Sequence, residues 1–386
     1  MPAAAVAIVL FVGASLLLAY VLVGYPVLLR LMAARRPKSV CKQHFQPAVS
    51  FIIPAHNGEK YLASKIQSIH TLDYPSHLIE IILIADGCTD ATEAIASAFA
   101  DVRLLSIPRG GKCAGLNAGI AAARHEILIL TDIRQRLNPD SLQHLMNCLA
   151  DPTVGVVSAD LHLTDTADSA AAQMANYRRL ETALRDSLSA LDSMFGATGA
   201  YYAMRRSLAL RALPLPHDLL LDDMYLPLTA FFSGYRLIIE PRAIAIDIAV
   251  PLEVEIGRKS RTLAGNYQLL RYMPQLLSFR NRMLGHFLSY KVGRLLMPYL
   301  LLVIAVSSVF LPYPLNVIAV AGQAAGYGLA LFDPWIPRGF PLKKLSAAAR
   351  AFVAMMIATV RALAIFFVPA GELWKTPTGI DKRRPA

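Results

Sequence analysis

The chain has 386 residues, of which 55% are hydrophobic and 17% charged, and its net charge is +11. Ordinary soluble enzymes carry charge on about a quarter of their residues, so this composition, with a mean hydropathy of +0.45, excludes that class. The four cysteines are scattered without the spacing of a metal site or a disulfide framework, which fits a reducing compartment. No recognised module combines a basic face with stacking aromatics, so we expect no nucleic-acid partner.

Three apolar runs account for the hydrophobic excess. Residues 3–29 carry no charge and suffice for one membrane crossing, which needs roughly 20 apolar residues. Residues 295–332 form a second run that can cross twice, with the prolines of LPYPLN at its turn. The third run, 351–370, is broken by Arg361. Because basic stretches stand on both sides of it, a crossing would export one of them; an in-plane or re-entrant helix avoids this, and a third C-terminal span is the alternative.

Basic residues set the expected orientation. Arg30, Arg35 and Arg36 follow the first run, and positive residues stay in the cytoplasm, so residues 34–290 are predicted to be cytosolic. This bias and contact with anionic lipid explain much of the net charge. The predicted parts are a transmembrane helix at 1–32, a cytosolic domain at 47–255, interfacial amphipathic helices at 256–293 (buried domain helices are the alternative), a transmembrane hairpin at 294–332, a third transmembrane or re-entrant helix at 350–371 and a basic tail at 372–386.

The middle of the chain alternates between strands and helices. The first helix has Tyr61, Leu62, Ile66 and Ile69 at helical spacing. Such alternation predicts a parallel sheet with helices on both faces, in which ligands bind beyond the carboxyl ends of the strands. Continuous apolar runs place the buried strands at 49–55, 80–86, 102–107 and 126–132.

Polar residues gather at these predicted strand ends. Asn57 and Glu59 follow the first strand and Asp86 the second, while Lys112 follows the third and Asp132 the fourth. One polar loop would need no explanation, because loops are polar in any case. Four successive loops with acids, a lysine and glycines at one edge favour a polar ligand. The GxGxxG fingerprint is absent, and PRGGKC lacks the spacing of a P-loop.

Several ordered segments resemble one known family. FIIPAHNGEKYL, IEIILIADGCTDAT, PRGGKCAGLNAGI and ILTDIRQRLNPDSL resemble the nucleotide-sugar domain of family 2 glycosyltransferases, and the likeness continues through GATGAYYAMRRSL, LLLDDMYLPL and GRKSRTLAG to about residue 300. The arrangement of apolar runs resembles the membrane-bound polysaccharide-synthase branch. The resemblance implies an α/β protein: a GT-A nucleotide-diphospho-sugar transferase domain with a mixed, mainly parallel sheet, plus N-terminal and C-terminal transmembrane helices.

The resemblance also implies a donor site. Asp86 would accept a hydrogen bond from the nucleobase, and Lys112 would lie near the nucleotide, with a solvated lysine as the alternative. RKSRT at 258–262 resembles the family's Gln-Arg-X-Arg-Trp element. Lys259, which replaces an arginine, and Arg261 could pair with the diphosphate, while Arg258 stands for the glutamine of the same donor-binding element. Thr262 stands for the tryptophan that stacks on the acceptor in processive synthases, which leaves processivity open. The nucleoside pocket would be lined by Pro54, Ala55, Asn57 and Glu59.

Asp132 occupies the first place of the family's Asp-X-Asp motif, which holds the ribose, the diphosphate and a divalent cation. The sequence reads DIR, so Arg134 stands in the place of the second acid. Either Asp132 binds the cation alone, or Arg134 contacts a phosphate directly as a fixed cation. Magnesium prefers one or two carboxylates with phosphate oxygens and waters. The resemblance therefore implies Mg²⁺ or Mn²⁺ as cofactor, with Asp132 as its protein ligand.

The acceptor side rests on two further segments. In LLLDDMY, Asp222 and Asp223 open a predicted helix; acids favoured by the helix dipole are the alternative to a catalytic pair. The family places the general base at the second acid, so Asp223 would take the proton of the acceptor hydroxyl. Attack opposite the leaving group would invert the anomeric centre. The acceptor site would be lined by Gly196, Thr198 and Gly199.

The resemblance therefore implies a multi-pass enzyme of a bacterial-type inner (plasma) membrane, with its catalytic domain in the cytosol. It would transfer a sugar from a nucleoside diphosphate to a growing glycan, an exopolysaccharide or a lipid-linked oligosaccharide. The alternatives are a polyprenyl-phosphate glycosyltransferase and a non-catalytic membrane component with a degenerate domain. Expected partners are the nucleotide-sugar donor, a glycan or lipid-linked acceptor, the lipid bilayer and other polysaccharide-biosynthesis proteins.

Overall fold

The computed structural model divides the chain into two compact units, each with its own fold. The first consists of Met1–Leu28, Leu252–Phe279 and Leu284–Ala386, and the second of Leu29–Pro251 and Arg280–Met283. The structure describes residues 2–163, 169–248, 252–337 and 339–370. The tail predicted at 372–386 lies outside these residues.

The first unit holds the apolar helices. Among the described residues, four helices are long and apolar enough to cross a membrane. The first, Ala4–Arg35, comprises most of α1 (Pro2–Ala19), a π-helical turn (Tyr20–Gly24) and α2 (Tyr25–Arg35), and it continues into the second unit. The second, Leu284–Val309, comprises α11 (Leu284–Phe287), a π-helical turn (Leu288–Val292) and α12 (Gly293–Val309). The third, Leu315–Trp335, includes α13 (Leu315–Phe332), and the fourth, Lys343–Phe366, includes α14 (Lys343–Arg361). The run predicted as a hairpin therefore contains two long helices, α12 and α13.

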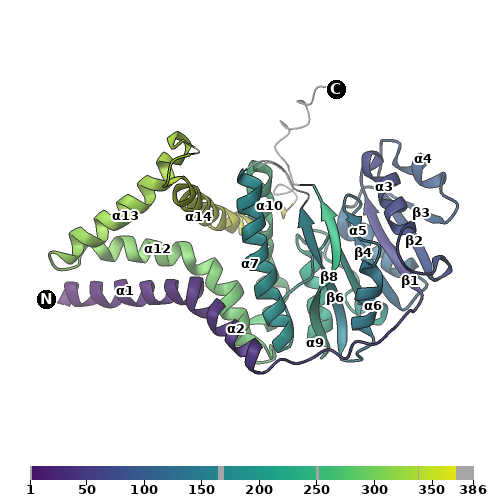
Figure 1. Cartoon of the computed structure of the whole chain (residues 1–386), viewed down its shortest axis with the longest axis horizontal. Helices are drawn as coiled ribbons and strands as arrows, with labels where there is room; N and C mark the ends of the chain where they lie inside the picture. The colour runs from purple at the N-terminus through teal and green to yellow at the C-terminus, as the bar shows by residue number, and fades with distance from the viewer. Residues whose placement is uncertain (1, 164–168, 249–251, 338, 371–386) are drawn as a thin grey trace. The chain divides into compact units, whose positions relative to one another are not determined.

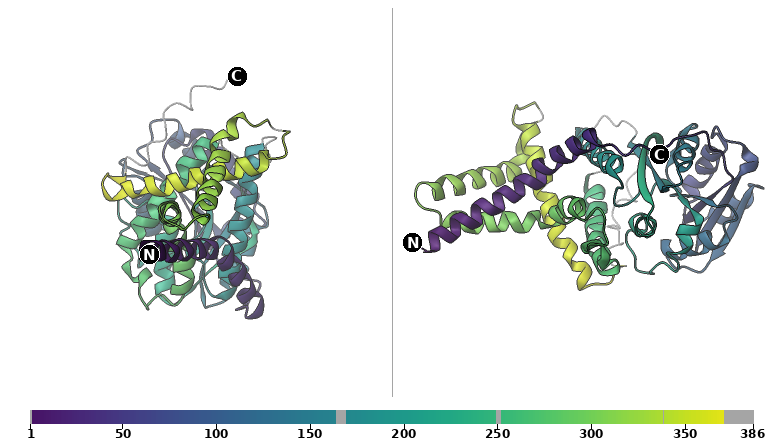
Figure 2. Two further views of the ribbon diagram at one scale, coloured as in Figure 1. Left: turned by 90° about the vertical axis from the view of Figure 1, so that its left-hand side faces the viewer. Right: turned by 90° about the horizontal axis from the view of Figure 1, so that it is seen from below.

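Two boundaries in the first unit differ from the predicted parts. The helix that begins at Leu284 continues into α12, so the last ten residues of the predicted interfacial segment, 284–293, belong to a candidate span. The remainder of that segment is mostly α10 (Leu252–Tyr272). α14 packs against α10, α12 and α13, and it runs steeply across the direction of α1 and α12 (Figure 1, Figure 2).

The second unit is built on an eight-stranded sheet in the order β3-β2-β1-β4-β7-β6-β8-β5. β1 pairs in parallel with β2 and β4, and β2 with β3; β7 is antiparallel to both β4 and β6, β6 is parallel to β8, and β5 is antiparallel to β8. The predicted GT-A-like, mixed and mainly parallel sheet is confirmed. The strands are β1 (Val49–Ala55), β2 (Ile79–Asp86), β3 (Val102–Ile107), β4 (Ile127–Thr131), β5 (Arg136–Leu137), β6 (Val154–Leu163), β7 (Tyr201–Arg205) and β8 (Arg236–Asp247).

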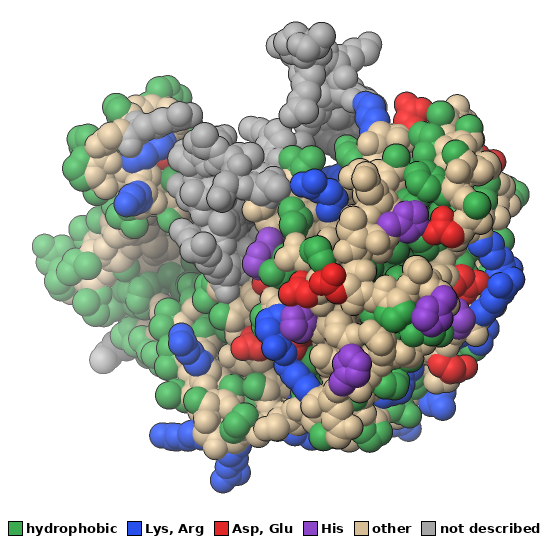
Figure 3. Space-filling view, turned by 45° about the vertical axis from the view of Figure 1, so that its right-hand side comes forward, with side chains coloured by type: hydrophobic (Ala, Val, Ile, Leu, Met, Phe, Trp, Pro, Cys, Tyr) green, Lys and Arg blue, Asp and Glu red, His purple; other side chains and the backbone are tan. Residues whose placement is uncertain are grey.

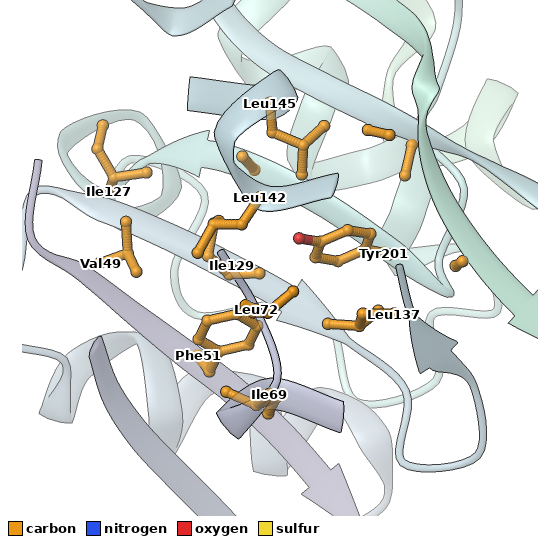
Figure 4. Close-up of a cluster of buried hydrophobic side chains, with 14 of the residues drawn as sticks. Val49, Phe51, Ile69, Leu72, Ile127, Ile129, Leu137, Leu142, Leu145 and Tyr201 are labelled. Atoms are coloured by element: carbon orange, nitrogen blue, oxygen red, sulfur yellow. The ribbon is translucent and has the colours of Figure 1, made fainter. Parts of the chain in front are cut away.

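Helices cover both faces of this sheet, which is why the central strands are apolar throughout. β1 alternates its side chains between the faces, with Phe51 packed among residues of α3 and α6, and Ile52 close to α5. Figure 4 shows the first of these cores, where Leu142 and Leu145 of α6 lie over the strands. Tyr61, predicted on the buried side of the first helix, is 39% exposed. The helices are α3 (Glu59–His70), α4 (Thr92–Ser97), α5 (Lys112–Ala122), α6 (Ser141–Leu149), α7 (Ser169–Leu191), α8 (Arg206–Leu210) and α9 (Asp222–Phe232).

Candidate active site

The carboxyl ends of β1, β2 and β4 meet at one edge of the sheet, and the residues predicted to bind the donor follow them. Asp86 is the last residue of β2, Lys112 is the first of α5, and Asp132 directly follows β4. Asp222 and Asp223 open α9. Figure 3 shows a face of the molecule on which acidic, basic and histidine side chains are interspersed. The chain thus delivers charged groups of both signs from widely separated segments.

Lys112 lies between two carboxylates. Its Nζ is 3.0 Å from Oδ1 of Asp132 and 3.1 Å from Oδ2 of Asp222. Burial alone would lower the pKa of Lys112, but the carboxylates of Asp132, Asp222 and Asp223 outweigh burial and raise its pKa above the usual range. The lysine therefore stays protonated over the whole working range of pH. This cluster brings four of the predicted site residues together.

Asp223 lies against the loop predicted to bind the acceptor. The backbone N–H of Gly199 donates to Oδ2 of Asp223 at 3.2 Å, and the N–H of Ala197 donates to its backbone carbonyl at 2.7 Å. A Cβ on Gly199 would lie 3.0 Å from Oδ2 of Asp223, so a side chain at this position would press on the carboxylate. The structure therefore places Gly196, Thr198 and Gly199 beside Asp223.

Arg185 of α7 donates hydrogen bonds to this loop, a role that the sequence did not reveal. Its guanidinium donates to Oγ1 of Thr198 at 2.7 Å, to Oγ of Ser158 at 3.1 Å and to the carbonyl of Gly196 at 3.3 Å. Ser158 in turn accepts from the N–H of Thr198 at 2.9 Å. A planar guanidinium suits such a set of fixed acceptors. Arg185 is therefore a positioning residue for the loop next to Asp223.

Lys65 of α3 ties down the turn that carries Asp132. It is 1% exposed, and its Nζ donates to Oγ1 of Thr131 at 2.6 Å and to the carbonyl of Gln135 at 2.9 Å. Thr131 Oγ1 also donates to the carbonyl of Ala200 at 2.7 Å, which links this turn to the loop at Asp223. Burial lowers the pKa of Lys65 to about 7, although the charge of Asp132 opposes this.

A signal for Lys65 exists in the sequence. The lysine stands three residues after Leu62 and four before Ile69, next to Ile66, so it shares the buried face of α3. A lysine in the apolar phase of a helix indicates a buried ammonium that needs acceptors. The alternation of strands and helices alone does not draw attention to it.

Tyr202 of β7 contributes a buried hydroxyl near the carboxylate cluster. The residue is 1% exposed, and no hydrogen-bond partner among the described residues reaches its hydroxyl. Burial raises its pKa well above the usual value, and the charges of Asp222, Asp223 and Asp132 raise it further. A buried hydroxyl without a partner costs about 1–3 kcal/mol. In a site built from charged groups, such a donor suits a ligand.

Asp86 is fully engaged by the protein. Its carboxylate accepts the N–H of Gly110 at 2.6 Å and that of Gly111 at 2.9 Å, and Arg109 forms an ion pair with it. A carboxylate offers about four acceptor positions, so little capacity is left for a base. Binding of a nucleobase by Asp86 therefore requires one of these partners to leave, and the side chain of Arg109, which is 55% exposed, has room in solvent to do so.

Asn57 and Glu59 lock two loops together. Oδ1 of Asn57 accepts the N–H of Thr89 at 2.8 Å, and Oε2 of Glu59 accepts the N–H of Ala91 at 3.0 Å. In the opposite direction, Asp90 accepts the N–H of Glu59 at 3.1 Å. These contacts join the loop after β1 to the loop after β2. The two side chains shape the edge of the sheet, and their contact with a nucleoside remains a prediction.

Arg134, in the place of the second acid of the motif, pairs with Asp247 at the end of β8. Gln135 also donates to Asp247, at 3.1 Å. The Asp247 side chain is 4% exposed, so Arg134 balances a buried charge. In this structure its guanidinium is thus committed to a carboxylate.

The remaining predicted residues fall into two groups. Pro54 and Ala55 end β1, within the edge just described. Arg258 and Arg261 lie on α10, which belongs to the first unit. Their contact with a donor remains a prediction.

The predicted Mg²⁺ or Mn²⁺ site requires enough protein carboxylates near Asp132 to hold the ion. No group of three or more His, Cys, Asp or Glu side chains able to hold a metal ion occurs within the described ranges. An ion that shares its coordination with diphosphate oxygens needs only one or two protein carboxylates. Asp132, whose side chain is 40% exposed, meets that condition with Asp222 nearby across Lys112.

Comparison with known proteins agrees with this reading of the fold. Residues 50–210 match the family described as "Glycosyl transferase family 2". The chain is 22% identical over 249 residues to the "Probable glycosyltransferase YdaM" of Bacillus subtilis (strain 168), covering 61% of this chain and 59% of that protein. It is 31% identical over 103 residues to the "Succinoglycan biosynthesis protein ExoO" of Rhizobium meliloti (strain 1021), covering 26% and 29%.

Among solved structures, the "Mannosyltransferase PcManGT from Pyrobaculum calidifontis in complex with GDP-Man and Mn2+" superposes with a TM-score of 0.70. The identity is 23%, and the alignment covers 93% of this chain and 99% of that one, so the likeness establishes the fold. The chain spans from a third to about three fifths of the length of the first curated relatives it matches. The match of residues 50–210, the GT-A fold and the glycosyltransferase relatives together support a family 2 glycosyltransferase domain in this chain, and with it a transferase.

Proposed function

We propose that this chain is an inverting membrane glycosyltransferase that moves a sugar from a nucleoside-diphosphate donor to a growing glycan, an exopolysaccharide or a lipid-linked oligosaccharide. One observation carries the proposal. Asp132, Asp222 and Asp223 surround Lys112 at the edge of the sheet, beside a glycine loop and an unsatisfied tyrosine hydroxyl. Such a set can hold a diphosphate through cations and can accept a proton.

Asp223 is better suited than Asp222 to act as the general base. Asp222 is 7% exposed and pairs with Lys112, so its charge is already compensated. Asp223 is half-buried and lies beside the Gly199 loop. In the proposed step the acceptor hydroxyl oxygen attacks the anomeric carbon and its proton passes to Asp223. The bond from the anomeric carbon to the diphosphate oxygen breaks, and the diphosphate leaves with the electron pair.

A divalent cation fits the charge of this site. Three carboxylates against one lysine would repel a diphosphate, because like charges at close range raise the free energy of binding. Asp132 would hold Mg²⁺ or Mn²⁺ together with oxygens of the diphosphate. When bound, the ion stabilises negative charge on the leaving diphosphate. Lys112 supplies a second, permanent positive charge at the same place.

Tyr202 would contact a bound ligand directly, and Arg185 would position the loop that binds the acceptor. The Tyr202 hydroxyl can donate to a ligand oxygen without breaking any existing bond, because it has no partner in the described part of the chain. Arg185 would keep the loop from Gly196 to Gly199 in place while the acceptor binds. The four long apolar helices would keep the enzyme at a bacterial-type inner membrane, with the site on the cytosolic side where nucleotide sugars are made.

The test is turnover of donors by the purified chain in detergent or vesicles with Mg²⁺ or Mn²⁺. A panel of UDP- and GDP-sugars, GDP-mannose included, is supplied with membrane lipid extract as acceptor, and the released nucleoside diphosphate is measured. We expect one donor to be consumed, with inversion seen by NMR of the product. Asp223→Asn should lower kcat by about 10²–10⁴-fold, the usual worth of an acid–base group, with little change in donor affinity.

The matched control is Asp101→Asn, which removes an exposed carboxylate just before β3, at the opposite edge of the sheet. It should keep wild-type turnover. A non-catalytic role is the rival hypothesis, and it predicts no consumption of any donor. Equal activity of wild type and Asp223→Asn with every donor would overturn the assignment of the base.

A further inference from the structure

α14 is the feature of the chain that the transferase activity does not explain. By length and composition the helix from Lys343 to Phe366 could cross a membrane. It nevertheless runs across the direction of α1 and α12 (Figure 1, Figure 2). A helix that crossed the bilayer beside α1 and α12 would follow them along their length.

The contacts of α14 lie at a single level of these two helices. Met356 packs in a cluster with Val21 of the first helix and Met297 of α12. Neighbouring side chains on the same three helices pack against this cluster: Leu18, Tyr20, Leu301, Phe352 and Met355. Val21 comes 17 residues after Ala4, where the first candidate span begins. At 1.5 Å per residue this is roughly 25 Å into a hydrocarbon core of about 30 Å. α14 therefore meets the bundle near the end from which the first helix continues toward Arg35.

The two ends of α14 are held at that level as well. At its start, Lys343 and Ser346 donate to the buried carboxylate of Asp333 at 2.9 and 2.7 Å, just after the end of α13. Beyond its other end, the ring of Phe366 packs edge-on against Tyr267 of α10 at 6.0 Å. Arg350 also pairs with this carboxylate, at 3.4 Å. A carboxylate with two basic partners is costly inside hydrocarbon and is readily accommodated at the interface. The whole helix is thus fastened to one end of the bundle.

The charges of α14 agree with this placement. Lys344, Arg350 and Arg361 are exposed and spread from one end of the helix to the other. A crossing would take one group of them to the outer side and place Arg350 within hydrocarbon. Lying in the membrane plane, the helix keeps all three at the same depth, where long basic side chains reach the headgroups. Leu345, an exposed apolar residue roughly 150° around the helix from Arg350 and Arg361, would enter the acyl region.

We propose that α14 is not a fourth span but an in-plane helix of the inner leaflet, which binds anionic phospholipid headgroups through Lys344, Arg350 and Arg361. The partner is identified by charge: the inner leaflet carries anionic lipids, and the exposed charged groups of α14 are all basic. This placement also resolves the conflict between the basic stretches on the two sides of 351–370. The proposal does not depend on the transferase reaction.

The first experiment places the two ends of the segment. Alkaline phosphatase and green fluorescent protein are fused after Tyr313, in the loop between α12 and α13, and after Ala386 of the full chain. An in-plane α14 leaves one crossing between these positions, so the two fusions must report opposite sides of the membrane. A spanning α14 gives two crossings and the same side for both. The comparison holds whichever way the first helix is inserted.

The second experiment tests the lipid. Thermal unfolding of the full chain in neutral detergent is followed with added phosphatidylglycerol, phosphatidylcholine or glycerol phosphate. We expect phosphatidylglycerol alone to raise Tm, because a ligand that binds the folded state stabilises it. The Lys344→Gln/Arg361→Gln variant should lose about half of that shift or more, and Lys60→Gln/Arg211→Gln, which removes two exposed charges from the second unit, should keep it. An equal shift in both variants, or one produced by glycerol phosphate, would overturn the lipid assignment.

Discussion

Lys65→Met is the most informative single change in the second unit, because it separates stability from activity. Moving the pKa of a buried lysine from the usual value of about 10.4 to about 7 corresponds to roughly 5 kcal/mol of disfavoured charge. The variant removes that cost and leaves the Gln135 carbonyl without its donor, a loss of about 1–3 kcal/mol. Thr131 keeps its bond to Ala200. At pH 6 we therefore expect the variant to be more stable than wild type by about 2–4 kcal/mol.

The sign of the pH dependence follows from proton binding. Between pH 7 and about 10 the unfolded chain holds a proton on Lys65 that the folded chain has lost, so wild-type stability rises with pH in this window. The advantage of Lys65→Met should shrink by about 3 kcal/mol between pH 6 and pH 9, measured as Tm in detergent. Its kcat should fall about 10- to 100-fold at both values, because the turn at Asp132 is released.

Lys60→Met is the matched control, since Lys60 is exposed on the same helix. It should change neither Tm nor kcat. A Tm difference between Lys65→Met and wild type that stayed constant from pH 6 to pH 9 would refute the reasoning, because it would mean that Lys65 keeps its proton in the folded state. Unchanged kcat in Lys65→Met would refute its part in positioning Asp132.

Three further changes test separate parts of the second unit. Tyr202→Phe should lower kcat or raise the donor or acceptor KM by about tenfold and leave Tm unchanged or higher, because it removes a buried hydroxyl without a partner; a lower Tm would show that the hydroxyl is bonded. Arg185→Met should raise the acceptor KM while donor hydrolysis persists, and loss of both activities would point to misfolding. Arg236→Met should lower stability by about 3–5 kcal/mol in thermal unfolding, because the guanidinium serves four backbone carbonyls, those of Lys38, Ser39, Ser189 and Asp192.

The parallel half of the sheet was readable from the sequence because three of its strands, β1, β2 and β4, are largely buried and form continuous apolar runs. β1 and β3 have the predicted bounds, 49–55 and 102–107; β2 begins one residue earlier than predicted, and β4 is one residue shorter at each end. β5 has two residues, too short to stand out as a periodic run, and β7, YYAMR, is not a continuous aliphatic run like β4. Their existence was implied by the family resemblance alone.

The site was readable where residues stand at strand ends or open a helix. Lys112 and Asp132 were expected at the same edge of the sheet, and Nζ of Lys112 lies 3.0 Å from Asp132 and 3.1 Å from Asp222, a predicted catalytic residue. Lys65 and Arg185 escaped notice because they act from within helices, where sequence order says nothing of which carbonyls lie beyond the helix. Only the packed structure shows that Lys65 reaches past the end of β4 to both sides of the Asp132 turn.

The packed structure also explains how Arg134 is accommodated in the place of the second acid of the motif. Replacing the second acid by Arg134 removes a negative charge, but the guanidinium pairs with the buried Asp247, so it adds no free positive charge at the diphosphate position. Releasing Arg134 to a phosphate would take this ion pair away from the buried Asp247, which disfavours the exchange. Under the proposed function, neutralisation of the diphosphate would therefore fall to Lys112 and to a cation held by Asp132. On this argument, Asp247→Asn should free Arg134 and lower the dependence of turnover on added Mg²⁺ or Mn²⁺, whereas an unchanged metal requirement would show that Arg134 stays clear of the phosphates even without its partner.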